Sequence, residues 1–173
     1  VMAITWLLLR GARESATANN VMVVIKLLAL GLFVVVGATH LTTANYTPFA
    51  PNGFTGIHQG AAIVFFAYIG FDAISTAAEE TRDPQRNLPI GILGGLAICT
   101  LIYVIVGAVL TGMVPYTELA VADPLARALE LAGFRAVGGV VAFGAVVSMS
   151  AVLLVFQYGQ PRIFFAMARD GLL

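Results

Sequence analysis

The sequence predicts an all-α integral membrane protein, on the basis of its composition, its hydropathy and the length of its apolar runs. Of the 173 residues, 60% are hydrophobic and only 10% are charged, and the mean hydropathy is +0.94. Four apolar runs reach the roughly 20 residues that a helix needs to cross a bilayer. The formal net charge is zero, so no basic surplus indicates a nucleic-acid partner. The predicted partner of these apolar runs is the lipid bilayer.

The predicted elements form a single membrane domain over residues 1–173. Residues 1–9 are too short to cross alone, and we expect them to end an earlier helix of a longer protein. Asp123 as an N-cap and Pro124 at the first helical position predict a short helix on the outer surface, and Pro89 suits the first turn of the span that follows it. The four spans and this surface helix are predicted at residues 21–39, 58–80, 90–114, 136–160 and 123–132.

The arginines between the spans predict how the chain is oriented. Six lie in one set of connections and two in the other, which favours a cytoplasmic location for the first set. Residues 40–57 then face outward. The first set comprises Arg10, Arg13, Arg82, Arg86, Arg162 and Arg169, and the second comprises Arg127 and Arg135.

The most informative span is residues 58–80, because it carries Gly70 and Asp72 near its middle. A charge at bilayer depth costs about 2.5–3.5 kcal/mol, so it usually faces a cavity, a pathway or a partner. Gly70 adds a residue of poor helix propensity. A span that is both charged and easily unwound is typical of a broken helix at a transport site.

Enzymatic functions find little support in the residues. His40 and His58 lie in or beside the outer loop, so no histidine is paired with a carboxylate inside the membrane, and neither metal-ligand spacing nor a nucleotide-binding glycine loop is present. Ser148 and Ser150 have no neighbouring base that would activate a nucleophile, and the single Cys99 excludes an intrachain disulfide. We therefore predict a protein that is not an enzyme and holds no cofactor or metal. A channel is the stronger rival, although no filter repeat or ring of charges is visible.

Three motifs resemble a known family. Residues 66–80 (FAYIGFDAISTAAEE) and 83–92 (DPQRNLPIGI) closely resemble the sixth helix and following loop of amino acid permeases. These permeases belong to the amino acid, polyamine and organocation superfamily, and the match is best in its cationic amino acid transporter branch. Residues 159–173 (GQPRIFFAMARDGLL) resemble the end of helix 8, and Arg13-Glu14-Ser15, with Asn20 and Lys26, resembles the start of helix 5.

The resemblance implies that the chain runs from the end of helix 4 to helix 8 of a twelve-helix, leucine-transporter-like fold. That fold has a five-plus-five inverted repeat and a discontinuous helix 6. The implied function is secondary active transport of amino acids, cationic ones above all, by alternating access. Coupling to protons or exchange would drive it, in the plasma or inner membrane. The alternatives are a channel and a carrier of polyamines or other organocations with the same fold.

The resemblance also assigns parts of the substrate site. Unwinding around Ala67–Phe71 frees backbone carbonyls, which persist at membrane depth only where they line a wet or liganded cavity. The carbonyls of Phe66 and Ile69 would accept hydrogen bonds from the substrate's α-amino group, and Gly70 would permit the break. Phe66 would also form an aromatic lid over the bound amino acid, or else be a plain packing residue.

Two roles remain open for Asp72. It could contact a cationic substrate side chain or help to gate the inner side. Alternatively, it could cap the second half-helix, where a carboxylate complements the positive end of the helix dipole. Capping does not require a residue that can be charged, so the carboxylate favours a basic substrate.

Lys26 is the second charge in an apolar run. It lies about 9 Å from the cytoplasmic end of its predicted span, so its side chain could snorkel to water. The resemblance implies instead that Lys26 takes the place of a sodium ion and exchanges a proton with each side in turn. Ser148 of helix 8 would be its partner, or else a small residue that lets helices pack closely. Glycines of the third span are interpreted as packing positions: Gly91, Gly94, Gly95 and Gly107.

Overall fold

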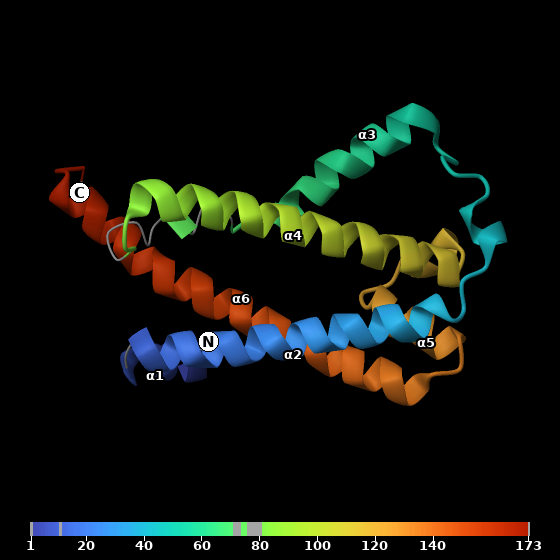
Figure 1. Cartoon of the computed structure of the whole chain (residues 1–173), viewed down its shortest axis with the longest axis horizontal. Coiled ribbons are helices and arrows are strands. Elements are labelled where there is room, and N and C mark those ends of the chain that lie inside the picture. The colour runs from blue at the N-terminus through green and yellow to red at the C-terminus, as the bar shows by residue number, and fades with distance from the viewer. Residues whose placement is uncertain (1, 11, 71–73, 76–80, 173) are drawn as a thin grey trace. The chain divides into compact units, whose positions relative to one another are not determined.

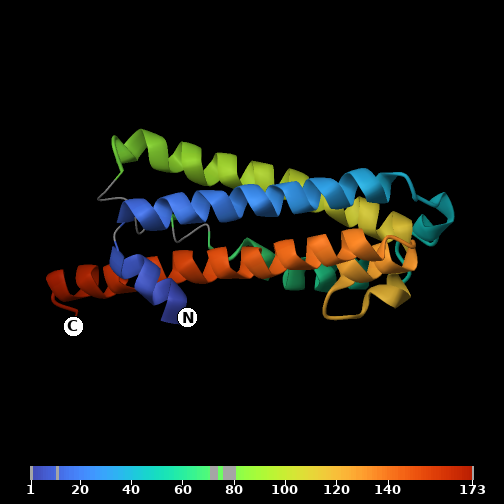
Figure 2. The same ribbon diagram turned by 90° about the horizontal axis from the view of Figure 1, so that it is seen from below.

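The computed structural model describes residues 2–10, 12–70, 74–75 and 81–172, and every regular element within them is helical (Figure 1). This confirms the all-α class. The long helices are α2, α4 and α6, each a continuous ribbon in both views (Figure 2). The α-helices are α1 (Met2–Arg10), α2 (Ala12–Ala38), α3 (Gly53–Val64), α4 (Pro84–Met113), α5 (Pro124–Leu131) and α6 (Arg135–Arg169), and the 3-10 helices are η1 (Thr43–Tyr46), η2 (Phe65–Tyr68) and η4 (Tyr116–Leu119).

Within the described ranges, three helices are long and apolar enough to cross a membrane: Glu14–Ala38, Pro84–Met113 and Arg135–Arg169. Four spans were expected. The run at residues 58–80 differs because its α-helix ends at Val64. Length and apolarity alone therefore do not distinguish a continuous span from the broken helix that was predicted for this run.

Two helices begin earlier than their apolar runs. α2 begins at Ala12 and not at Val21, and α4 begins at Pro84, which places Pro89 inside the helix and not at its start. The backbone N–H groups of Arg86 and Asn87 both donate to the Asp83 carbonyl, which closes the first turn of α4. An apolar run marks only the part of a helix suited to lipid, whereas the helix itself continues through polar residues into water.

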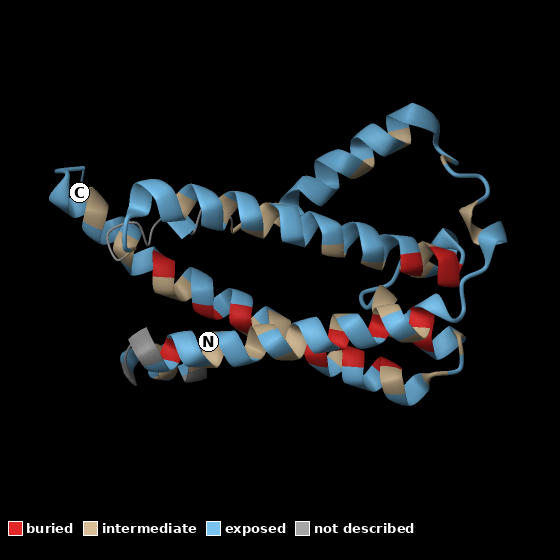
Figure 3. Ribbon diagram, viewed as in Figure 1, coloured by how far each residue is buried: buried red, intermediate tan, exposed pale blue. Residues whose placement is uncertain are grey.

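The chain packs as two compact units. The first comprises Val1–Val24, Tyr68–Ile98 and Ser148–Leu173, and the second comprises Ile25–Ala67 and Cys99–Val147. The second unit holds a hydrophobic core in which Phe33 and Leu129 have no exposed surface. Figure 3 colours the ribbon by burial, and most of it is exposed. Most large apolar side chains elsewhere on the long helices are exposed, which suits surfaces that face lipid or further helices.

The short helix α5 begins and ends with recognisable caps. The Asp123 carboxylate accepts a hydrogen bond from the Ala126 N–H at 3.3 Å, and Pro124 occupies the first helical turn, as the sequence predicts. Gly133 follows the helix with φ +89°, and the Phe134 N–H donates to the Leu129 carbonyl at 2.8 Å. These caps hold α5 so that its buried Leu129 completes the core of the second unit.

Close helix contacts occur at glycines other than the predicted ones. A Cβ added at Gly144 of α6 would lie 2.5 Å from the Ala29 Cβ of α2, and one at Gly37 would lie 2.5 Å from a methyl group of Val109. A Cβ added at the four glycines predicted to pack (Gly91, Gly94, Gly95 and Gly107) would meet nothing within 4 Å among the described residues. Spacing along one helix does not reveal which of its faces another helix approaches.

We expect Gly144→Ala to lower the free energy of unfolding of the full-length protein by about 1–3 kcal/mol, because the new methyl group overpacks the contact with Ala29. Gly139→Ala in the same helix is the matched control, since its Cβ would meet nothing within 4 Å. That change should be neutral or stabilise by up to about 1 kcal/mol. Unfolding of both variants in detergent measures the difference, and equal stabilities would contradict the close approach.

Candidate functional site

The candidate site is an interruption in the apolar run that contains Gly70. α3 ends at Val64, the 3-10 helix η2 spans Phe65–Tyr68, and Ile69 and Gly70 form a turn. Gly70 has φ +117°, a conformation that residues with a Cβ rarely adopt. The α-helix therefore ends within the apolar run, shortly before the stretch Ala67–Phe71 in which the sequence predicts unwinding. Asp72 lies outside the described residues.

The side chains around the interruption are exposed. Phe66 is 68% exposed and Ile69 is 53% exposed. The Phe65 and Phe66 rings meet edge to face, with their centroids 6.3 Å apart. Phe66 therefore does not pack in the hydrophobic core, and its role as a lid stays a prediction.

Tyr103 of α4 contacts the interruption directly, and the sequence reasoning missed it. Its hydroxyl donates a hydrogen bond to the Ala67 carbonyl at 3.0 Å. Ala67 was predicted to lie within the unwound stretch. Its carbonyl accepts a hydrogen bond from a side chain of another helix. Tyr103 is an amphipathic residue in the apolar run of α4, and a tyrosine there usually finds a partner for its hydroxyl. A tyrosine within this apolar run is therefore the sequence signal that could have indicated the contact.

The two residues predicted for proton coupling lie on separate long helices. Lys26 is half-buried in α2, and Ser148 is half-buried in α6. Lys26 belongs to the second unit and Ser148 to the first. Lys26 lies about 9 Å along α2 from Asn20, the last polar residue before the apolar run.

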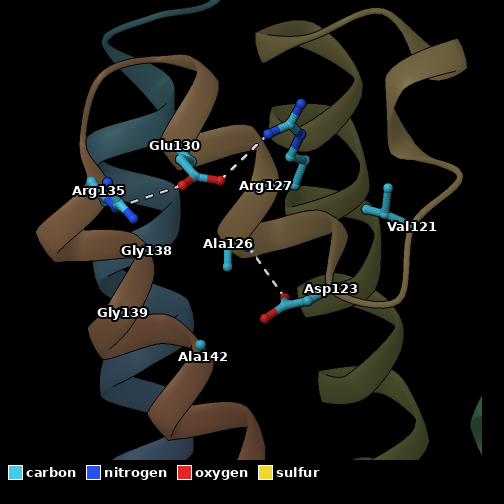
Figure 4. A pocket seen from close by; sticks show the side chains of 9 residues that line it. All are labelled: Val121, Asp123, Ala126, Arg127, Glu130, Arg135, Gly138, Gly139 and Ala142. Carbon is cyan, nitrogen blue, oxygen red and sulfur yellow. Dashed lines mark hydrogen bonds and ion pairs between the residues drawn. The ribbon is translucent and has the colours of Figure 1, made fainter.

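A second group of polar side chains surrounds a cavity of about 420 Å³ beside α5 (Figure 4). Glu130 lies between two arginines, with oxygen-to-nitrogen distances of 3.4 Å to Arg127 and 3.7 Å to Arg135. These side chains are 42% exposed or more, and exposed ion pairs contribute about 0–1 kcal/mol. The group links α5 to the start of α6 and has no chemistry that points to a substrate.

The first unit has a smaller set of contacts where α1, α2 and α6 meet. The Gln157 side chain donates to the Thr5 hydroxyl at 2.6 Å, and the buried Ser15 hydroxyl donates to the Leu7 carbonyl at 3.3 Å. The Arg162 guanidinium lies 3.6 Å from the centre of the Tyr158 ring, a cation-π contact. The first two contacts join α1 to α6 and to α2, whereas the third lies within α6.

The comparison with known proteins decides the family. A family model described as amino acid permease matches residues 1–173, the whole chain. The chain belongs to the amino acid permease family. This confirms the resemblance drawn from the motifs around Gly70 and at the end of α6, and it makes the chain part of a transporter family and not of an enzyme family.

The relatives of this chain differ in the substrates that their names give. The branched-chain amino acid permease BcaP of Bacillus subtilis is 49% identical over 173 residues, covering 99% of this chain and 37% of that protein. The methylthioribose transporter of the same organism is 46% identical over 173 residues, covering 100% and 38%. Cationic amino acid transporter 9, chloroplastic, of Arabidopsis thaliana is 44% identical over 170 residues, covering 98% and 30%. This permease chain therefore spans about a third of the length of these curated relatives.

Proposed function

We propose that the full-length protein is a secondary active transporter that moves amino acids across a membrane by alternating access. The observation that carries the proposal is the interrupted helix, where α3 ends at Val64 and Gly70 turns the chain with φ +117°. Backbone that leaves the helix at membrane depth is tolerated where it is buried in protein or lines a cavity. Broken helices are a recurrent way of building substrate sites in transporters.

The substrate site is proposed to use this backbone. In our proposal, the carbonyls of Phe66 and Ile69 accept hydrogen bonds from the α-ammonium group of the amino acid, and Phe66 covers it from the outer side. Gly70 permits the turn that separates the two half-helices. The facing wall, a second broken helix, belongs to the twelve-helix inverted-repeat fold in which this chain forms helix 4 end to helix 8.

The coupling ion is proposed to be a proton carried by Lys26, with the Ser148 hydroxyl as a partner. The presence of a charged residue in the apolar run of α2 supports this proposal, because a charge at membrane depth is costly and is usually retained for a function. Net uptake would then follow a pH gradient, whereas exchange of one amino acid for another would not need one.

Amino acids with cationic side chains are the proposed substrates, since Asp72 supplies a carboxylate next to the break. One relative, named a cationic amino acid transporter, supports this choice. A relative named a methylthioribose transporter favours a second candidate, a carrier of a neutral solute with the same fold. The proposed location is the plasma or inner membrane, although one relative's name places it in the chloroplast.

The proposal is tested by uptake into vesicles that contain the purified full-length protein. Radiolabelled arginine, leucine and methylthioribose are each offered with and without an inwardly directed proton gradient. Saturable uptake of arginine that a proton gradient increases supports the proposal. Transport of methylthioribose alone would favour the second candidate, and a flux that does not saturate would indicate a channel.

Asp72→Asn separates a substrate-binding role from a capping role. If the carboxylate contacts a cationic side chain, its loss should weaken transport of arginine by roughly tenfold or more and leave leucine transport nearly unchanged, because a charge-assisted hydrogen bond contributes about 1.5–3 kcal/mol. The measurement is the ratio of kcat/KM for the two substrates. Asparagine caps helices about as well as aspartate, so a capping role predicts little change for either substrate. Any effect that is equal for arginine and leucine would assign Asp72 to the scaffold.

A further inference from the structure

We propose that Tyr103 is a positioning residue that orients the ammonium-binding carbonyls of the interrupted helix by holding the Ala67 carbonyl. The proposal rests on the function proposed above and extends it to a residue of α4. Its basis is the 3.0 Å hydrogen bond from the Tyr103 hydroxyl to the Ala67 carbonyl, which joins two segments that are 36 residues apart in the chain. Both residues belong to the second unit.

The contact falls just beyond the last regular turn of α3. In an α-helix each carbonyl accepts from the N–H group four residues later, and this pattern ends with α3 at Val64. Ala67 lies past that point, in η2. The Tyr103 hydroxyl gives this carbonyl a side-chain donor from another helix. Such a partner is valuable at membrane depth, where polar backbone groups need hydrogen bonds.

Holding one carbonyl restricts its neighbours. The peptide unit is planar and each residue has only two soft dihedral angles. The carbonyl proposed to bind the ammonium group belongs to Phe66, the residue immediately before Ala67. A fixed Ala67 carbonyl therefore limits the directions in which the Phe66 carbonyl points. Tyr103 touches no substrate in this scheme and acts through the backbone.

The chain offers a matched control in Tyr46. Its hydroxyl also donates to a backbone carbonyl, that of Ala108 in α4, at 2.8 Å. This hydrogen bond joins the segment after α2 to α4 and does not involve the interruption. Tyr46→Phe and Tyr103→Phe thus remove the same chemical group from the same kind of hydrogen bond. Only the second change reaches the proposed site.

The test uses the full-length protein in vesicles and compares two competitors of labelled amino acid uptake. One competitor is the unlabelled amino acid, and the other is its des-amino carboxylic acid, which lacks the ammonium group. The preference for the amino acid measures ammonium recognition directly. We expect Tyr103→Phe to reduce this preference and to raise KM by about threefold to tenfold, with a smaller change in kcat, since a single hydrogen bond has a modest net effect.

Tyr46→Phe should leave the preference for the amino acid unchanged. A loss of preference in Tyr103→Phe alone would then not come from a general loss of stability. Tyr103→Trp retains a ring N–H donor and should recover part of the preference, and it is also the second variant if Tyr103→Phe fails to fold. A Tyr103→Phe protein with the wild-type preference would overturn the positioning role while leaving the proposed function intact. A wild-type protein without any preference would overturn ammonium recognition itself and, with it, the role of Tyr103.

Discussion

Uptake driven by a pH gradient is expected to disappear when Lys26 is replaced by alanine in the full-length protein. The alanine side chain carries no proton, so the proposed coupling step has no carrier. The position of Lys26 strengthens this expectation. Lys26 lies in the apolar run of α2, where a charge is costly and is usually retained for a function.

Two further variants separate the proton from the charge. Lys26→Arg keeps a positive charge but does not release its proton, because the guanidinium group remains protonated in proteins. It should therefore fold normally and still lose the response to pH. Leu28→Ala is the control for a change in the same helix, since Leu28 is 68% exposed and outside the proposed machinery. Uptake by Lys26→Ala that keeps its wild-type dependence on pH would refute the coupling role.

Gly70→Ala is expected to reduce transport by more than tenfold and to destabilise the protein. Gly70 has φ +117°, and holding a residue with a Cβ in such a region costs about 1–3 kcal/mol. The strain arises from the backbone, because a Cβ at this position would meet nothing within 4 Å. The protein would either bear this cost or straighten the turn, and straightening would move the proposed ammonium-binding carbonyls.

The control for Gly70→Ala is the same substitution at Gly94 of α4. That glycine is helical, and an added Cβ would meet nothing within 4 Å. Alanine there should stabilise the helix by up to about 1 kcal/mol and leave transport unchanged. Unfolding in detergent and initial rates of uptake distinguish the two variants. If both retain wild-type transport, the turn at Gly70 is not required for the transport cycle.

Several features of the fold could be predicted from the sequence because they depend on neighbouring residues. The Asp123-Pro124 pair predicts the start of α5, since capping and the fixed φ of proline act within one helical turn. The glycine in the apolar run of residues 58–80 predicts an interruption, because its backbone freedom is an intrinsic property. The extent of α2 and α4 was less predictable, as polar turns that continue a helix carry no hydropathy signal.

The candidate site likewise combines residues that the sequence indicates with one that only the structure shows. Phe66 and Gly70 stand out in the sequence by their motif and composition, and Lys26 by its charge. The contribution of Tyr103 could not be read in the same way, because its partner Ala67 lies 36 residues away. The packing glycines also differ from those predicted, since Gly144 meets a residue of α2 that no local pattern connects with α6.

The sequence by itself determined the membrane class, the family and the position of the interruption, because hydropathy, motifs and glycine propensity are properties of short segments. Only the tertiary structure decided that α4 supplies a hydroxyl to the interruption and that Gly144 is the close contact with α2. Both depend on which faces of distant helices meet. That choice follows from packing over the whole unit and from the fit of particular side chains, so no single segment contains it.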